Sequence, residues 1–231
     1  MEKINAPRAV DLVANRLREA VLSGEFPPGA FLPPERELSV TLGVSRLTLR
    51  AAVSRLEAEG LLRARQGSGV VVLDYRTEAG VELLTYLLAD GDIALLRPLL
   101  QLRRAIAVEA MAVACAQATD EDIARLSALA EELAQSEDLD RLAEGNLDFV
   151  RAVIRLADNL PLELLFNTVV RVFRTRPELS AAMLADPDAV RASFPFIVGL
   201  IRSREADRAR TLVRGALEAI DTATLAALEI A

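Results

Sequence analysis

Arginine and threonine side chains gather in one short stretch of the chain, residues 45–53. If this stretch is helical, Arg46 and Arg50 are four residues apart and lie on one face, and Thr48 stands between them in the sequence. A guanidinium group pairs bidentately with O6 and N7 of guanine, and a threonine hydroxyl contacts a base edge or a phosphate. The spacing therefore predicts a surface that reads DNA bases. A single arginine would more often be an ordinary solvated charge, so the interpretation depends on the set.

Four further residues flank this stretch. Ser45 directly precedes the expected helix and predicts an N-cap. Arg36 falls in the first turn of the preceding helix, from which it can reach the DNA backbone or a base. Gln66 and Gly67 fall in a turn, where they can approach the minor groove or a phosphate, because glycine lets the backbone come close.

The first 76 residues contain the elements that would position these side chains. Helical periodicity runs from about residue 8 to 22, whereas residues 26–34 contain four prolines and a glycine and cannot be helical. Further helices are expected over 34–42 and 45–59, with Gly43 in the turn between them. Two β-prone runs, 61–65 and 70–73, flank a glycine-containing turn and predict a hairpin. This order of elements predicts a winged helix-turn-helix.

Histidine is absent, and the chain contains one cysteine and no tryptophan. These counts exclude Ser-His-Asp and Cys-His catalysis, histidine-ligated metals, internal disulfides and multi-cysteine metal sites within one chain. Only oxygen ligands remain for a metal, which would restrict it to magnesium, calcium or manganese. Cys115 lies in an apolar helical segment and is expected to be an inert buried thiol.

The net charge of −7 is unevenly distributed. Residues 1–77 carry a net charge of +2 and residues 78–231 a net charge of −9. The chain therefore changes its electrostatic character near residue 77, and only its first part favours a polyanionic partner. We find no signal-peptide pattern and no apolar run long enough to span a membrane, so a cytoplasmic protein is expected.

Beyond residue 77 the pattern is helical throughout. Helices are expected over 77–90, 93–117, 120–136, 139–158, 161–176, 186–204 and 205–227. The short connections favour antiparallel packed neighbours. We therefore predict a mainly α protein with two domains: a winged helix-turn-helix with a small β-hairpin at residues 1–76, and an all-α antiparallel helical bundle at residues 77–231.

The first domain resembles the N-terminal domain of the GntR family of bacterial transcription regulators. The resemblance covers about residues 8–73 and rests on the segments P-E-R-E-L, L-G-V-S-R-L-T-L-R and Q-G-S-G in this order. It implies that five residues contact DNA and that Ser45 contacts a phosphate. The five matching positions are Arg36, Arg46, Thr48, Arg50 and Gly67.

The second domain resembles the effector-binding domain of the FadR-type subgroup, through Leu-Arg-Arg at 102–104, the segment 141–159 and the final helix pair. Most such domains are expected to hold a divalent metal with one aspartate and three histidines. In this sequence Asn146 takes the aspartate position, Val150 takes the first histidine position, and Phe194 and Ala216 fall near the other two. Because no histidine exists in the chain, the resemblance implies a domain without metal and without any cofactor.

Replacement of these ligands by less polar residues predicts an apolar pocket, which suits an acyl chain or an aromatic acid. The resemblance implies that Arg103 binds an anionic head group, with Arg171 as a second choice. Asn146, Val150 and Phe194 would line the pocket. Two alternatives stay open: Arg103 is paired with an acidic neighbour on its helix, and Phe194 is ordinary core.

Together these observations predict a cytoplasmic homodimer that binds double-stranded operator DNA of pseudo-palindromic sequence, without a membrane partner. Its effector would be a small organic acid or acyl compound, such as a fatty acyl-CoA. Two other functions are considered: a DNA-binding dimer that binds no ligand, and a small helical enzyme with an ancillary DNA-binding domain. The lack of histidine, of a phosphate-binding loop and of a dinucleotide motif argues against the enzyme.

Overall fold

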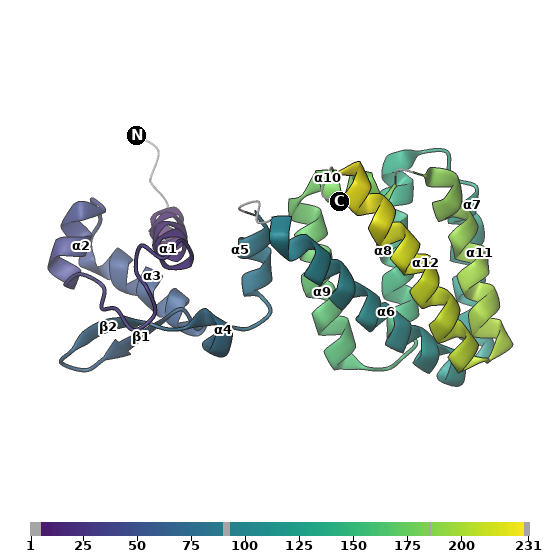
Figure 1. Cartoon of the computed structure of the whole chain (residues 1–231), viewed down its shortest axis with the longest axis horizontal. Helices are drawn as coiled ribbons and strands as arrows, with labels where there is room; N and C mark the ends of the chain where they lie inside the picture. The colour runs from purple at the N-terminus through teal and green to yellow at the C-terminus, as the bar shows by residue number, and fades with distance from the viewer. Residues whose placement is uncertain (1–5, 90–92, 185, 229–231) are drawn as a thin grey trace. The chain divides into compact units, whose positions relative to one another are not determined.

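The computed structural model describes residues 6–89, 93–184 and 186–228, and the chain divides into two compact units, residues 1–83 and 84–231 (Figure 1). We call them the N-terminal unit and the helical unit. The predicted fold class is confirmed, with helices throughout and one small antiparallel sheet in the N-terminal unit.

Three helices form most of the N-terminal unit: α1 (Ala6–Leu22), α2 (Glu35–Thr41) and α3 (Arg46–Ala58). Each agrees with the predicted helix to within two residues at either end. The apolar stripe of α3 is buried, and Leu49 and Leu56 are fully enclosed where α3 packs against α1.

The hairpin consists of β1 (Leu62–Arg65) and β2 (Gly69–Val72), paired antiparallel. The proline-rich segment before α2 is not helical, as predicted, and it adds an extended edge to the hairpin. Phe31 forms an isolated antiparallel bridge with Val71, and the amide of Leu32 donates to the carbonyl of Val70 over 2.8 Å. The prolines are tolerated because they lie at an edge, where fewer backbone donors are needed.

The single helix expected over 77–90 is wrong. The structure has two short helices, α4 (Tyr75–Glu78) and α5 (Leu83–Ala89), and residue 90 lies outside the described residues. Asp74 caps α4 and starts it before residue 77, whereas Ala79 adopts an extended conformation that ends it. Gly80 follows directly, and glycine in this place lowers the tendency of the chain to continue a helix.

In its described part the helical unit contains α5 from residue 84 onward, a one-turn 3₁₀ helix and seven further α-helices. Its bounds are η1 (Ile93–Leu95), α6 (Leu96–Gln117), α7 (Asp120–Ala134), α8 (Leu139–Arg155), α9 (Leu160–Thr175), α10 (Pro177–Met183), α11 (Pro187–Ser203) and α12 (Ala206–Ala227). The short helix α10 was not predicted. A proline starts it, as prolines also start α11 and the first turn of α9, because proline needs no backbone donor there.

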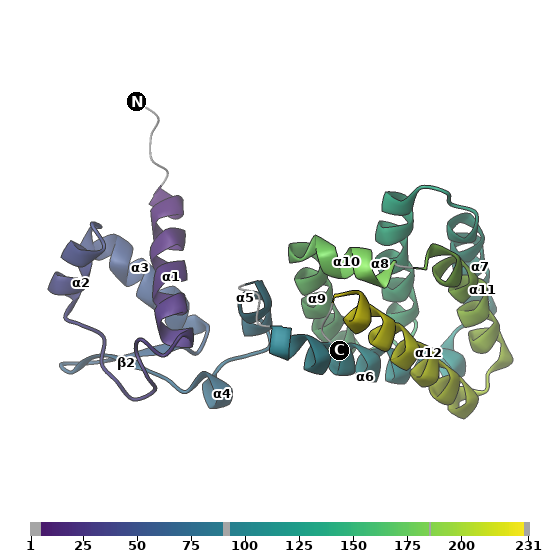
Figure 2. The ribbon, with the colours of Figure 1, turned by 45° about the horizontal axis from the view of Figure 1, so that its top comes forward.

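Helix α6 lies at the centre of the helical unit, as its apolar composition predicts. It packs against α12 along much of its length and also contacts α8, α9 and α11 (Figure 2). The apolar side chains form two clusters, one between α6, α7, α8 and α11 and the other around α6, α9 and α10. The second half of the chain thus has a core of its own.

Candidate DNA interface and effector region

The turn between α2 and α3 places the start of α3 at the surface. Gly43 has a φ of +64°, which favours glycine, and the amide of Val44 donates to the carbonyl of Ser39. Ser45 follows in an extended conformation and is the N-cap of α3, as predicted. The first turn of α3 is thereby fixed in position and direction.

Ser45 and Thr48 form a hydroxyl pair at this N-terminus. The Thr48 amide donates to Ser45 Oγ over 3.1 Å, and the two side-chain oxygens are 2.8 Å apart. A hydroxyl has one proton and two lone pairs. If Thr48 donates to Ser45, both lone pairs of Ser45 are used and its proton stays available for an acceptor such as a phosphate oxygen.

Arg46 and Arg36 have exposed side chains at the start of α3 and α2. Among the described residues, neither side chain forms an ion pair or a hydrogen bond. An unpaired arginine on a protein surface has all five of its donors available to a phosphate or a base edge.

Arg50 is held differently, by a carboxylate of α2. Its Nε donates to both oxygens of Glu35 at 3.0 and 2.9 Å, and Nη2 lies 2.9 Å from Oε2. The hydrogen bond from Arg50 holds the pKa of the Glu35 carboxyl below its usual value, and the same bond raises the pKa of Arg50. Glu35 occupies one edge of the guanidinium, and the Nη1 side faces away from this pair.

The hairpin turn carries the two predicted wing residues, and both are exposed. Gly67 has a φ of +76°, and nothing lies within 4 Å of the place where a Cβ would be. The turn is closed by the amide of Ser68, which donates to the carbonyl of Arg65. The exposed side chain of Arg65 next to this turn is a further cation that our sequence analysis did not select, although its place in the expected hairpin was a usable signal.

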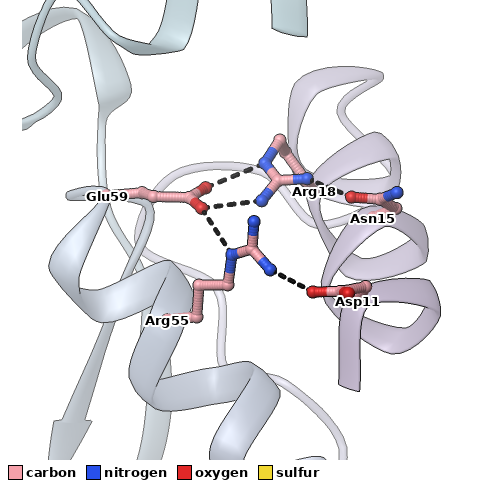
Figure 3. A network of polar contacts seen from close by, with 5 residues as sticks. All are labelled: Asp11, Asn15, Arg18, Arg55 and Glu59. Carbon is pink, nitrogen blue, oxygen red and sulfur yellow. Dashed lines mark hydrogen bonds and ion pairs between the residues drawn. The ribbon is translucent and has the colours of Figure 1, made fainter. Parts of the chain in front are cut away.

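A polar network fixes α3 to α1 behind the exposed face (Figure 3). Arg18, which is only 3% exposed, donates to both oxygens of Glu59 over 2.8 and 2.7 Å and to Asn15 over 2.7 Å. Arg55 binds Asp11 and also approaches Glu59. Arginines of the N-terminal unit thus have two roles: those of this network hold the helices together, and those at the start of α3 face solvent.

In the helical unit, Arg103 is buried and paired. It is 6% exposed, and its Nη2 donates to Asp221 Oδ1 over 2.5 Å, while Arg104 donates to Asp221 Oδ2 over 2.8 Å. Burial lowers the pKa of Arg103 against the opposing effect of Asp221, and burial raises the pKa of Asp221. Asp221 lies 118 residues further along the chain, on α12. The positive charge of Arg103, which the resemblance assigns to ligand binding, is therefore balanced by an acidic residue of the protein itself.

Phe194 is fully buried and packs edge-to-face against Phe149, with ring centroids 4.9 Å apart. Val150 is half-buried, and the exposed Arg171 donates to Thr168 Oγ1 over 3.1 Å. Cys115 is buried as expected, and burial raises the pKa of its thiol. The structure thus gives Phe194 a packing role, which is one of the alternatives left open by the sequence.

A cavity of about 530 Å³ lies between α8 and α9 and is open to solvent. Of the five predicted effector residues, Asn146 lines it and the other four do not. Among the described residues the cavity is lined by Ala143, Glu144, Asn146, Leu147, Asp148, Phe173, Arg174 and Leu184. The structure therefore does not gather Arg103, Val150, Arg171 and Phe194 around this cavity. Within the described residues no cluster of three or more candidate metal ligands occurs.

Comparison with known proteins assigns each of the two units to a known domain. Residues 10–72 match the model of bacterial regulatory proteins of the gntR family, and residues 98–219 match the FCD domain. The chain belongs to the GntR family. A relative from Mycobacterium tuberculosis, described as an uncharacterized HTH-type transcriptional regulator, is 31% identical over 92% of this chain and 88% of its own length.

A second relative, the fatty acid metabolism regulator protein of Edwardsiella ictaluri, is 29% identical over 91% of this chain and 88% of its own length. Two solved structures share the fold at lower identity. GntR of Streptococcus agalactiae has a TM-score of 0.50 at 22% identity, covering 92% of this chain and 99% of that one. Lar of Listeria monocytogenes has a TM-score of 0.55 at 19% identity, covering 93% and 95%.

The chain is therefore a FadR-type transcription regulator with a GntR DNA-binding domain and an FCD effector domain. It is not an enzyme, because the family and its relatives regulate transcription, and the alternative of a helical enzyme is set aside. Among the described residues no helix combines the length and apolar character needed to cross a membrane.

Proposed function

We propose that this regulator acts as a homodimer in which two copies of α3 read the halves of a pseudo-palindromic operator. The observation that carries the proposal is the exposed, unpaired side chain of Arg46 on the first turn of α3, the part of a recognition helix that enters the major groove. Two-fold symmetry in the protein requires a matching symmetry in the DNA. A regulator of this kind works at the nucleoid, so we propose a cytoplasmic location.

Each predicted contact has a role in this proposal. Arg46 and Arg50 bind guanine edges, and Thr48 contacts a base edge or a phosphate. Ser45 donates its hydroxyl proton to a phosphate, and Arg36 binds the backbone or a base from the side. At the wing, two exposed residues approach the minor groove or a phosphate. They are Gln66 and Gly67.

For the helical unit we propose an effector that is a small organic acid or an acyl compound, including a fatty acyl-CoA. The name of the Edwardsiella relative supports this class of ligand. The cavity between α8 and α9 offers an apolar wall that includes Leu147, Phe173 and Leu184, together with the amide of Asn146 and the cation of Arg174. An acidic head group would bind at Arg174.

The DNA-reading role is tested with a library of random-sequence duplexes and the full chain. Wild-type protein should enrich one pseudo-palindromic site. Arg46→Ala should weaken binding to that site by roughly tenfold or more, since a bidentate arginine–guanine pair contributes about 1–3 kcal/mol of discrimination. Arg16→Ala removes the same charge from exposed α1 and serves as the matched control. Equal affinity of Arg46→Ala and the control would refute the proposed role of α3.

The effector role is tested by native mass spectrometry of the purified chain and by thermal unfolding with a panel of acyl-CoAs and organic acids. A ligand that binds only the folded state raises the unfolding temperature. Arg174→Ala should abolish the increase caused by an acidic ligand, whereas Arg155→Ala, on the exposed surface of α8, should preserve it. The buried Phe149–Phe194 pair favours the second candidate, a ligand-blind dimer, and a panel without any shift would support that candidate instead.

A further inference from the structure

Helix α3 presents one large apolar side chain to solvent. Leu47 is 80% exposed, between Arg46 and Thr48 in the first turn. At about 100° per residue, its direction is opposite to the middle of the buried stripe formed by Leu49, Ala52, Val53 and Leu56. Leu47 is therefore the residue of the first turn that points most directly away from the protein core.

The positions of α3 that lie in line with Leu47 along the helix carry short side chains. Three exposed residues follow Leu47 along the same face of the helix: Ala51, Ser54 and Ala58. Short side chains let a helix approach a partner surface closely, so a partner of α3 would meet Leu47 before it meets the helix backbone.

An apolar side chain at this place restricts what it can contact. The edges of adenine, guanine and cytosine in the major groove present hydrogen-bonding groups, and thymine alone adds a methyl group. Pressing a leucine against a donor or acceptor would remove water without replacing its hydrogen bond, which is unfavourable. Contact with a methyl group removes apolar surface from water on both sides.

We propose that Leu47 reads the 5-methyl group of one thymine in each half of the operator. This inference rests on the proposed role of α3 as the recognition helix. It adds to that role a base preference that arginines cannot supply, because it depends on apolar contact rather than on donors and acceptors. Leu47 is then a specificity-determining residue whose removal leaves the charge of the reading surface unchanged.

The experiment uses the site that wild-type protein enriches from a random-sequence library. Each thymine of one half-site is replaced in turn by deoxyuridine, which removes only the methyl group. We expect one replacement to weaken wild-type binding about fourfold, the effect of losing one buried methyl-sized contact. Leu47→Ala should bind the unmodified site about fourfold more weakly and should be insensitive to the same replacement.

Val40→Ala is the matched control, because Val40 is another aliphatic side chain, 77% exposed, on α2 rather than α3. It should keep both the affinity and the sensitivity to deoxyuridine. If Leu47→Ala stays as sensitive to the replacement as wild type, or if no thymine matters to wild type, the inference is overturned while the role of α3 stands. If wild-type protein enriches no site at all, the proposed function itself is wrong.

Discussion

In the two units of this regulator, the residues that match family positions lie in different environments. In the N-terminal unit, Arg36, Arg46 and Arg50 are exposed at the start of two short helices. In the helical unit, Arg103 and Phe194 are enclosed by other helices, and Arg103 is paired with an acid. The same kind of sequence match therefore identifies a surface in one unit and part of the packed interior in the other.

The difference follows from what each unit must contact. DNA is a large external partner, so residues that bind it have to remain at the surface. An effector binds inside or between helices, where the same positions can be filled by packing or by an internal ion pair when a ligand group is missing. A buried charge without a partner is strongly unfavourable, so Asp221 supplies the negative charge that Arg103 needs.

The largest expected effect concerns this buried pair. Asp221→Asn leaves the charges of Arg103 and Arg104 without their shared carboxylate, and we expect the free energy of unfolding to fall by about 3–5 kcal/mol. The double variant Arg103→Met with Asp221→Leu should recover most of this loss, because it removes both buried charges. Urea unfolding of the full chain, followed by circular dichroism, measures both changes.

The matched change in the N-terminal unit is Glu59→Gln, which removes the negative charge that faces the buried Arg18. This substitution should also lower the free energy of unfolding, and the loss should occur in the unfolding transition of the N-terminal unit. A stable Asp221→Asn variant would mean that Arg103 does not depend on its internal partner. Arg103 would then again be a candidate for binding the effector, and the contrast between the two units would weaken.

Local sequence signals account for most of the N-terminal unit. Gly43, the N-cap Ser45 and the glycine-containing hairpin turn act within a few residues of their own positions, and the structure has the predicted elements there. Helical periodicity also predicts the outward direction of Leu47, but Leu47 has neither a charge nor a hydroxyl group and was not predicted to contact DNA. Apolar residues on a reading surface are easily mistaken for core.

The helical unit was less predictable because its decisive contacts are distant in sequence. Nothing near Arg103 indicates that Asp221 will lie beside it, since the two are 118 residues apart. The cavity likewise needs α8 and α9 to be placed before Asn146 can be seen on its wall. The helices themselves were largely predicted, except where Ala79 interrupts the expected helix and where α10 was missed.

A smaller effect, on DNA binding, is expected from a change of Glu35. This carboxylate pairs with Arg50, whereas Arg46 forms no ion pair among the described residues. Because Glu35 holds Arg50 by one edge, it should direct the opposite side of the guanidinium toward a base. Glu35→Gln weakens this orientation and also removes a negative charge near the phosphates. We expect the ratio of specific to non-specific affinity to fall about fivefold, since one oriented arginine contact contributes about 1 kcal/mol or more of discrimination.

Binding of the enriched site and of a scrambled duplex, measured at one salt concentration, gives this ratio. Glu37→Gln removes the same charge from another position in the first turn of α2 and should strengthen both affinities slightly without changing their ratio. If Glu35→Gln also changes both affinities by one common factor, Glu35 acts only as a charge. Arg50 would then resemble Arg46 in being oriented by the DNA alone.

The smallest expected effect is on stability, and it concerns the side chains that cap helices in the two units. Helix α3 is capped by the hydroxyl of Ser45, which does not titrate, whereas α7 has a capping box in which Thr119 and Asp122 bind each other reciprocally. The hydrogen bonds from Thr119, followed by that from Arg125, lower the pKa of Asp122 from 3.8 to about 2. The charged form of Asp122 is therefore favoured in the folded state.

A carboxyl whose folded-state pKa is lowered contributes stability above its unfolded pKa and loses that contribution as the pH falls through the folded value. The contribution of Asp122 should be complete above about pH 5, start to fall near pH 4 and be gone below about pH 2. The stability difference between wild type and Asp122→Asn, measured by urea unfolding, should shrink over this range. The difference for Ser45→Ala should stay constant, because its cap is a hydroxyl, and a parallel decline would contradict the assignment.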